Sequence, residues 1–235
     1  MRLSCILTAR LSRAVQVLIV TIGLWGMLYA KSEPELDGQS ILASLEKSYG
    51  KRAQKRGKAW LKLMKTQGEN TELEKLNKVN RFFNLFHFID DIKLWGSENY
   101  WASPLEFIGV NGGDCEDFAI AKYFTLRELG IADEKMRITM VKAANIRKYH
   151  MVLAYYQTPG AVPLILDNLD GAVKTADKRK DLIPVYSFNA SQLWLNKEKG
   201  KGLLSGKASR LTLWRDLRQR ISAATLKQPK LKLEF

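Results

Sequence analysis

The sequence predicts an α+β fold in which several helices are followed by an antiparallel sheet. The chain has 235 residues, of which 46% are hydrophobic and 26% charged, so it can build one domain around a packed core. Apolar residues recur at helical spacing as far as residue 129, and after Gly130 they alternate with a period of two. Helices that precede strands, rather than alternate with them, favour the α+β class.

The first 30 residues have the pattern of an export signal. Residues 1–13 carry three arginines and no acid, and residues 14–30 form a stretch without charge. A basic segment followed by an apolar run is typical of a secretory signal peptide. Such a run is also just long enough to span a bilayer, and Leu28 fits poorly before a cleavage site after Ala30. We therefore expect a signal peptide or a retained anchor in residues 1–30, followed by an exported domain in residues 31–235.

The exported part is strongly basic. The whole chain carries a net charge of +14, and +11 remains beyond residue 30. The C-terminal tail, residues 197–235, contains 11 basic and 3 acidic residues. This excess can solvate the surface or attract an acidic partner or membrane, whereas export and the lack of a recognisable motif argue against nucleic acid. Two cysteines, Cys5 and Cys115, exclude a disulfide scaffold, and two histidines, His87 and His150, disfavour a structural zinc site.

Two helices are expected before residue 90. An apolar pattern predicts a helix over residues 38–66, and Gly68 interrupts it. A second pattern, rich in phenylalanine, predicts a helix over residues 71–89 that would include His87. Residues 95–113, which end in a pair of glycines, show no such period and are expected to form a loop.

The next helix, predicted over residues 115–129, is expected to be the centre of the fold. Asp114 stands where an N-cap residue belongs, and Gly130 is a natural residue to end the helix. Apolar side chains occupy most sides of this helix, which predicts that it is buried.

Strands are expected after Gly130. The period of two predicts strands over residues 137–143, 151–157 and 162–168, with a turn at Thr158-Pro159-Gly160. The C-terminal tail contains one amphipathic helix pattern, formed by Leu211, Trp214, Leu217 and Ile221.

Cys115 is the candidate nucleophile. It would lie in the first turn of the central helix, where backbone N–H groups and the helix dipole favour a thiolate and can bind an oxyanion. A thiolate needs a base, and His150 at the start of a strand is a better candidate than His87 in a phenylalanine-rich helix. Taken alone, a cysteine at a helix start is more often a small buried apolar residue.

Asp167 is the candidate for the third residue, which would orient the histidine. If Gln157 pairs with Val162 across the turn, His150 and Asp167 lie diagonally on one face of the sheet. A slip of one residue would place them on opposite faces. Each residue alone has an ordinary structural explanation, but their order along the chain is that of a cysteine-dependent catalytic triad.

Three acids, Asp114, Glu116 and Asp117, flank the cysteine. Their negative charge raises the pKa of a neighbouring thiol and opposes formation of the thiolate. Two interpretations are open. The acids can serve the N-terminus of the helix, where negative charge is favoured. They can also bind Ca²⁺, which would cancel their effect on the thiol.

Several segments together resemble a known family. Residues 100–130 read YWASPLEFIGVNGGDCEDFAIAKYFTLRELG, and they are followed by HMVLAYY from His150, LDNL from Leu166 and PVYSFN from Pro184. With VNRFFN from Val79, these segments resemble the bacterial transglutaminase-like cysteine proteases over about residues 38–196. The GDCED segment with HMVL and LDN in order after it is specific for this family.

The resemblance implies a papain/transglutaminase-like fold, with the cysteine-bearing helix packed on an antiparallel sheet. It implies a cysteine endopeptidase whose catalytic residues are Cys115, His150 and Asp167. The family's calcium site falls on the three acids beside the cysteine. By analogy with transglutaminases, Trp101 is a candidate group for binding the oxyanion or the substrate, although a core aromatic residue is the better interpretation.

The resemblance also implies a biological setting. The substrate would be the N-terminal region of a large surface adhesin, cut at a site of small residues in the periplasm, so that biofilm cells are released. The implied regulator is an inner-membrane cyclic-di-GMP receptor of the LapD type, which would sequester the protease. Two alternatives stay open: a transglutaminase or amidase with the same triad, and a non-catalytic calcium-binding adaptor that does not use the thiol.

Overall fold

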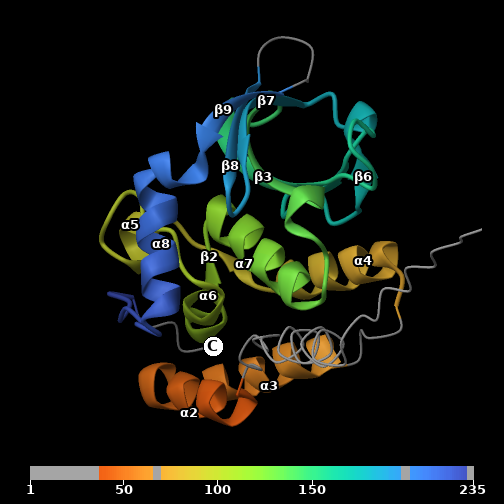
Figure 1. Ribbon diagram of the computed structural model, residues 1–235. Coiled ribbons are helices and arrows are strands. Elements are labelled where there is room, and N and C mark those ends of the chain that lie inside the picture. The colour runs from red at the N-terminus through yellow and green to blue at the C-terminus, as the bar shows by residue number, and fades with distance from the viewer. Residues whose placement is uncertain (1–36, 66–69, 197–201, 232–235) are drawn as a thin grey trace, which may run out of the picture. The chain divides into compact units, whose positions relative to one another are not determined.

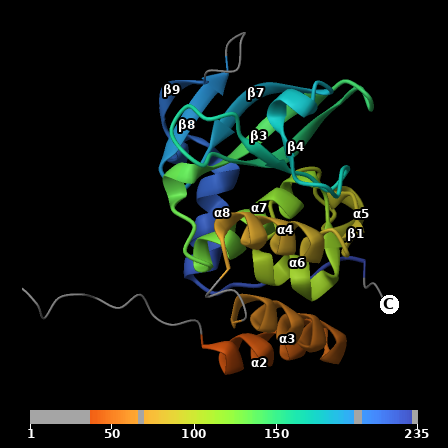
Figure 2. The ribbon, with the colours of Figure 1, turned by 90° about the vertical axis from the view of Figure 1, so that its right-hand side faces the viewer.

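A central helix lies between other helices and one face of a curved antiparallel sheet (Figure 1). The computed structural model describes residues 37–65, 70–196 and 202–231. The helices are α2 (Gly38–Tyr49), α3 (Lys51–Lys65), α4 (Glu72–Phe83), α5 (Asp91–Leu94), α6 (Pro104–Val110), α7 (Cys115–Glu128) and α8 (Thr212–Ser222). Helices α2 and α3 form the layer farthest from the sheet, while α4 and α6 pack beside α7 (Figure 2). The predicted order of helices first and strands second is confirmed.

The predicted helix over residues 38–66 was wrong in one respect, because it is two helices. Gly50 separates α2 from α3 and has a φ of +87°, a conformation that glycine adopts without strain. The two helices fold back on each other and bury one face, which includes Leu45, Ala53 and Trp60. Their exposed faces carry most of the basic residues of this region, which fits the amphipathic pattern.

Two further boundaries differ from the prediction. Helix α4 begins at a Thr71 capping box but ends at Phe83, so His87 lies in a short strand, β1 (His87–Phe88), and not in a helix. Strand β1 pairs in parallel with β2 (Gly112–Gly113). The loop expected over residues 95–113 was wrong in part, because it contains helix α6. Ser103 caps this helix and Pro104 is its first residue, and these two residues signal a helix start that the spacing of apolar residues does not show.

The sheet has seven strands, and all neighbouring pairs are antiparallel. Their spatial order is β6-β5-β4-β3-β7-β8-β9. The strands are β3 (Met136–Ala143), β4 (Lys148–Tyr155), β5 (Leu164–Leu166), β6 (Lys174–Thr175), β7 (Leu182–Phe188), β8 (Gln192–Asn196) and β9 (Gly202–Lys207). Leu153 pairs with Leu166 and Tyr155 with Leu164, which is the predicted register.

The two faces of the sheet have different neighbours. Met151 and Leu153 of β4 belong to the main core with helix α7, whereas Val152 and Ala154 belong to a second apolar cluster on the opposite face. Side chains alternate between faces along a strand, so successive residues of β4 contribute to the two clusters in turn. The predicted helix 115–129 is confirmed as α7, and nine of its residues are buried.

The C-terminal tail is integrated into the fold. The amphipathic helix predicted there is α8, which buries Trp214 and Leu217 against the core. Strands β6, β7, β8 and β9 were not predicted, and neither was the ordered segment after α8. The backbone N–H of Lys230 donates to the carbonyl of Leu94, which ties the end of the chain to helix α5.

The predictions for the N-terminus fall on residues 1–30, which lie outside the described residues. Among the helices that the structure does describe, none has the length and apolar character needed to cross a membrane.

Candidate active site

Cys115 is the first residue of α7, and the chain before it is shaped by close packing. Asp117 folds back so that Oδ2 accepts a hydrogen bond from the backbone N–H of Asp114, at 3.3 Å. This brings the Asp117 carboxylate against Gly113, where a Cβ would lie 2.3 Å from Oδ2. A side chain at position 113 would collide with this carboxylate. The packing therefore explains why glycine, Gly113, stands at the start of the GDCED segment.

His150 and Asp167 form a buried pair at the ends of two neighbouring strands, β4 and β5. Nε2 of His150 lies 2.7 Å from Oδ1 of Asp167, and both side chains are almost fully buried. They meet because the register of β4 and β5 sets Val152 opposite Asp167, one diagonal step from His150. Since Asp167 occupies Nε2, Nδ1 is the nitrogen left to act as a base.

Arg179 completes this pair from the other side. Its Nη2 donates to Oδ2 of Asp167 at 2.8 Å, and its guanidinium also pairs with Asp181. Burial alone would raise the pKa of Asp167, but hydrogen bonds from His150, Leu169 and Arg179 lower it to about 2. Asp167 is therefore a carboxylate at neutral pH. The sequence offered no signal for Arg179, which lies in a coil 12 residues beyond Asp167.

Helix α4 supports the same pair through Asn84, its C-cap residue. Nδ2 of Asn84 donates to the backbone carbonyl of Asp167 at 2.8 Å, and Oδ1 accepts from Nζ of Lys122 at 2.7 Å. Lys122 projects from α7 and is 1% exposed, and burial lowers its pKa to about 7. The pair is thus held by the sheet, by α4 and by α7.

The residues around Cys115 disfavour its ionisation to a thiolate. Among the described residues, Sγ makes a hydrogen bond with Glu116, to Oε2 at 3.2 Å, and none with His150. Burial raises the pKa of the thiol far above its usual range, and the charges of Glu116 and Asp114 raise it further. The predicted conflict between the acids and the thiol is present in the structure.

Three carboxylates gather beside the cysteine, and we call Asp91, Asp114 and Asp117 the acidic cluster. One ligand atom from each can be chosen so that all lie within 4.8 Å of one another. Of the predicted acids, Asp114 and Asp117 are in the cluster, whereas Glu116 bonds to the cysteine. Asp91, in the first turn of α5, was missed because it lies 23 residues earlier in the sequence and only the fold brings it to Asp114.

The acidic cluster is not neutralised by the protein. No lysine or arginine in the described part of the chain forms an ion pair with any of its three members. Burial raises the pKa of Asp91 to about 7, and burial together with the neighbouring carboxylates strongly raises the pKa of Asp114 and Asp117. Oδ1 of Asp91 and Oδ1 of Asp114 are buried without a hydrogen-bond partner among the described atoms.

The donor set of the acidic cluster fits a hard cation. Carboxylate oxygens are the ligands that Ca²⁺ prefers, and two orphaned buried oxygens point to a missing partner. Backbone N–H groups orient two of the three carboxylates: Tyr100 donates to Asp91 Oδ2 at 2.5 Å, and Ala102 donates to Asp117 Oδ1 at 2.7 Å.

Trp101 lies between these two donors and is a core residue. The residue is 5% exposed, and its ring stacks on Phe188 with 5.5 Å between centroids. Its carbonyl accepts a hydrogen bond from Arg220 of α8. This placement fits the preferred interpretation of Trp101 as a core aromatic residue.

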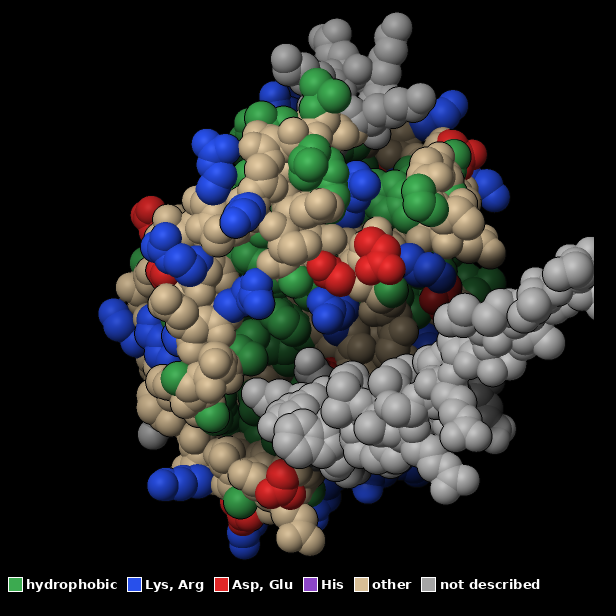
Figure 3. Space-filling model, viewed as in Figure 1, with side chains coloured by type: hydrophobic (Ala, Val, Ile, Leu, Met, Phe, Trp, Pro, Cys, Tyr) green, Lys and Arg blue, Asp and Glu red, His purple; other side chains and the backbone are tan. Residues whose placement is uncertain are grey.

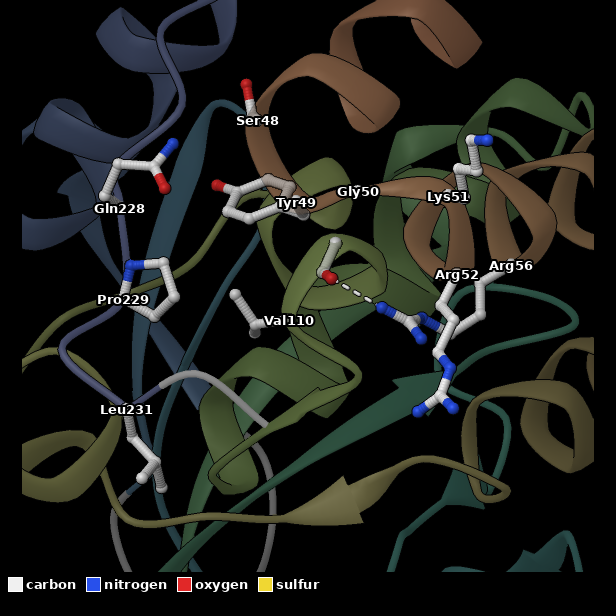
Figure 4. A pocket seen from close by; sticks show the side chains of 11 residues that line it. Ser48, Tyr49, Gly50, Lys51, Arg52, Arg56, Val110, Gln228, Pro229 and Leu231 are labelled. Carbon is white, nitrogen blue, oxygen red and sulfur yellow. Dashed lines mark hydrogen bonds between the residues drawn. The ribbon is translucent and has the colours of Figure 1, made fainter. Parts of the chain in front are cut away.

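Two large cavities lie elsewhere, and neither is lined by Cys115, His150 or Asp167. One, of about 630 Å³, lies between the α2–α3 connection, the end of α6 and the C-terminal segment; there Arg56 reaches the carbonyl of Gly109 (Figure 4). The other, of about 590 Å³, lies on the sheet face of Val152 and includes Arg179. Lysine and arginine side chains are spread over the visible face of the molecule and do not form one patch (Figure 3).

The arrangement of a cysteine at a helix start, a histidine–aspartate pair on the adjoining sheet and this α+β topology is that of a transglutaminase-like thiol hydrolase. Residues 47–201 match the family described as bacterial transglutaminase-like cysteine proteinases. The chain belongs to this family and is a cysteine protease.

Solved structures of Legionella pneumophila LapG are similar to this chain. The EGTA-treated form is 41% identical, with a TM-score of 0.71, and the match covers 80% of this chain and 100% of that one. The calcium-bound form is 42% identical, with a TM-score of 0.68, over 79% of this chain and 99% of that one. A third LapG structure matches at 41% identity and a TM-score of 0.69, over 80% and 97%. The comparison with curated proteins gave no match.

Proposed function

We propose that the protein is a calcium-dependent periplasmic endopeptidase that cleaves the N-terminal region of a large surface adhesin. Release of the adhesin would promote biofilm dispersal, under the control of an inner-membrane cyclic-di-GMP receptor. The observation that carries the calcium-dependent protease is the position of an unneutralised acidic cluster directly beside the candidate nucleophile Cys115. Similarity to LapG, of which a calcium-bound form is known, supports it.

The catalytic roles follow from the hydrogen bonds of each residue. Asp167 accepts the Nε2 proton of His150 and so keeps Nδ1 free of a proton, which allows Nδ1 to take the proton of Cys115. The thiolate attacks the scissile carbonyl, and backbone N–H groups at the start of α7 bind the oxyanion. His150 then protonates the leaving amine, and water hydrolyses the thioester. Cys115 and His150 share no hydrogen bond in the described structure, and catalytic hydrogen bonds of this kind often form only in the complex with substrate.

Asp91, Asp114 and Asp117 would hold the calcium ion. A bound Ca²⁺ supplies positive charge that offsets the three carboxylates and so lowers the pKa of the Cys115 thiol. The chain's own contribution is to fix the ligands: Tyr100 and Ala102 orient Asp91 and Asp117, while Asp114 leaves one oxygen unpaired for the ion.

The cellular setting rests on two further arguments. The basic segment and uncharged run in residues 1–30 support export to the periplasm, either as a released or as an anchored protein. The adhesin substrate and the cyclic-di-GMP receptor come from the family resemblance alone. The excess of basic residues would suit an acidic adhesin or receptor surface.

The test is cleavage of an N-terminal adhesin fragment from the same cell by the purified protein. We expect cleavage with Ca²⁺, loss of cleavage with excess EGTA, and no cleavage by Cys115→Ala with either. Mass spectrometry of the products should find one new N-terminus at a site of small residues. Equal cleavage by Cys115→Ala would exclude the cysteine mechanism. Incorporation of a labelled amine into the fragment, in place of hydrolysis, would instead establish a transglutaminase.

A further inference from the structure

Arg179 shares the carboxylate of Asp167 with His150. We propose that Arg179 is a positioning residue of the catalytic site, which holds Asp167 in the orientation that fixes the imidazole of His150. The proposal rests on the proposed function, since it concerns the same triad. Arg179 would act only through Asp167 and would not touch the substrate.

The first argument is that both carboxylate oxygens of Asp167 accept hydrogen bonds. Oδ1 accepts from His150 at 2.7 Å and from the backbone N–H of Leu169 at 3.0 Å, and Oδ2 accepts from Arg179 at 2.8 Å. The side chain of Asp167 is 0% exposed and that of Arg179 is 6% exposed. The carboxylate therefore cannot rotate without breaking buried charge-assisted hydrogen bonds, which is costly.

The second argument is that Arg179 is itself held rigidly. Its Nε and Nη2 donate to the two oxygens of Asp181 at 3.0 and 2.8 Å, a bidentate geometry with little freedom. Its backbone N–H donates to Ala176, and the carbonyl of Asp181 accepts from Ala144 at the end of β3. Arg179 is thus anchored to the sheet independently of Asp167.

The third argument concerns the proton on His150. If Asp167 carried a proton, it would donate to Nε2 and leave the ring proton on Nδ1, which could then no longer accept the proton of Cys115. Hydrogen bonds from His150 and from the guanidinium of Arg179 keep Asp167 ionised although its side chain is fully buried. A neutral or misplaced side chain at position 179 would therefore affect the chemical step more than substrate binding.

The second cavity provides a matched control for a mutation of Arg179. Arg179 and Arg137 both line the cavity of about 590 Å³, but only Arg179 contacts Asp167. Arg137 lies against the rings of Trp194 and Tyr156. Arg137→Gln is therefore a matched control, because it removes a guanidinium from the same cavity and leaves Asp167 untouched.

In the calcium-loaded full chain, Arg179→Ala should lower kcat by about 10²-fold, the effect of a small misplacement of reacting groups, with little change in KM. The acidic limb of the pH–kcat/KM profile should move to higher pH. Arg179→Lys should recover part of kcat. Added guanidinium should enter the enlarged cavity and raise kcat of Arg179→Ala, whereas an equal concentration of potassium chloride should not. Arg137→Gln should retain wild-type kcat and its pH profile.

The outcomes separate the two proposals. If Arg179→Ala keeps wild-type kcat, or if Arg137→Gln loses as much as Arg179→Ala, the positioning role is wrong. If the wild-type protein cuts nothing, the proposed function fails, yet the contact is still measurable by NMR because the chain has only two histidines. The Nε2–H proton of His150 should be protected in wild type and Arg137→Gln and exchange rapidly in Arg179→Ala; protection in Arg179→Ala would also overturn the proposal.

Discussion

Two groups of buried carboxylates lie in the same site and have opposite electrostatics. Asp167 is surrounded by donors, and its pKa is lowered to about 2. The acidic cluster has no cationic partner in the described chain, and the pKa of each member is raised. Both groups accept hydrogen bonds from backbone N–H groups, so the difference comes from the side chains of His150 and Arg179, which donate to Asp167 and have no counterpart at the described residues around the acidic cluster.

The contrast shows which half of the site is complete. The histidine–aspartate pair is charge-balanced by the protein and is expected to be preformed with or without calcium. The nucleophile half depends on an added cation, because three acids raise the pKa of the thiol that must ionise. Calcium control of such an enzyme would therefore act on Cys115 and not on His150.

The largest expected effect comes from a mutation in the charge-balanced pair of His150 and Asp167. Asp167→Asn should lower kcat by about 10⁴-fold, because an amide favours the wrong tautomer of His150. It should also lower the free energy of unfolding by about 2 kcal/mol, since Arg179 loses one charge-assisted hydrogen bond while keeping its pair with Asp181. Calcium affinity should not change. Kinetics, urea unfolding and calorimetry measure the three quantities; unchanged kcat would exclude Asp167 from the triad.

The next effect comes from removing one charge from the acidic cluster. Asp114→Asn keeps a good N-cap residue, so α7 should remain intact. Calcium affinity should fall by about 10-fold or more, as expected when one charged ligand is lost. In EGTA, however, Cys115 should react faster with iodoacetamide than in wild type, because one of the charges that raise its pKa is gone.

The control for Asp114→Asn is Glu98→Gln, which removes an exposed acid from the loop after α5. It should change neither calcium affinity nor the reactivity of Cys115. An unchanged iodoacetamide rate in Asp114→Asn would show that burial, and not the acids, limits the thiol.

The dependence of stability on pH should differ in sign between the two halves. Asp91 has a raised pKa of about 7, so the folded protein without calcium binds more protons than the unfolded chain between about pH 4 and 7, and stability falls as pH rises through that window. Asp167 has a lowered pKa, so its contribution is lost only as pH falls from about 4 towards 2. Thermal unfolding in EGTA and in Ca²⁺ across this range tests the contrast: the stabilisation by calcium should grow from pH 4 to 7, and a constant value would contradict it.

The sequence predicted the half of the site that depends on local order and register. Cys115 at a helix start was evident from Asp114 and the paired glycines, and the pairing of His150 with Asp167 followed from a correct hairpin register. The residues that set the electrostatics could not be found this way. Asp91 and Arg179 reach the site through tertiary packing from coil or a four-residue helix, where no periodic pattern marks them.

The fold shows the same division. In the central helix and in strands β3, β4 and β5, apolar residues recur with a clear period, and the bounds of these elements were predicted within a few residues. The break at Gly50 was missed because apolar residues continue on both sides of it, and α6 was missed because its seven residues are too few to show a period. Only the capping signal Ser103-Pro104 identifies α6.

The smallest predicted effect concerns the basic tail, whose role the charge count left open. Nη2 of Arg220 in α8 donates to the carbonyl of Trp101 at 2.5 Å, and Nη1 pairs with the buried Glu106 at 2.7 Å. Trp101 lies between Tyr100 and Ala102, whose N–H groups orient Asp91 and Asp117. We therefore expect Arg220→Ala to loosen the acidic cluster from a distance.

Arg220→Ala should weaken calcium binding by about 3- to 10-fold, the range of a typical coupling of 1 kcal/mol or slightly more. Activity at saturating Ca²⁺ should stay near wild type, because no catalytic residue is touched. Arg218→Ala is the matched control, since Arg218 lies on the same helix and bonds instead to the carbonyl of Ala190. Calorimetric titration with Ca²⁺ measures the calcium affinity of the wild type, Arg220→Ala and Arg218→Ala. If Arg220→Ala and Arg218→Ala bind calcium as wild type does, the acidic cluster is held by its own loop, and the tail contributes only to folding.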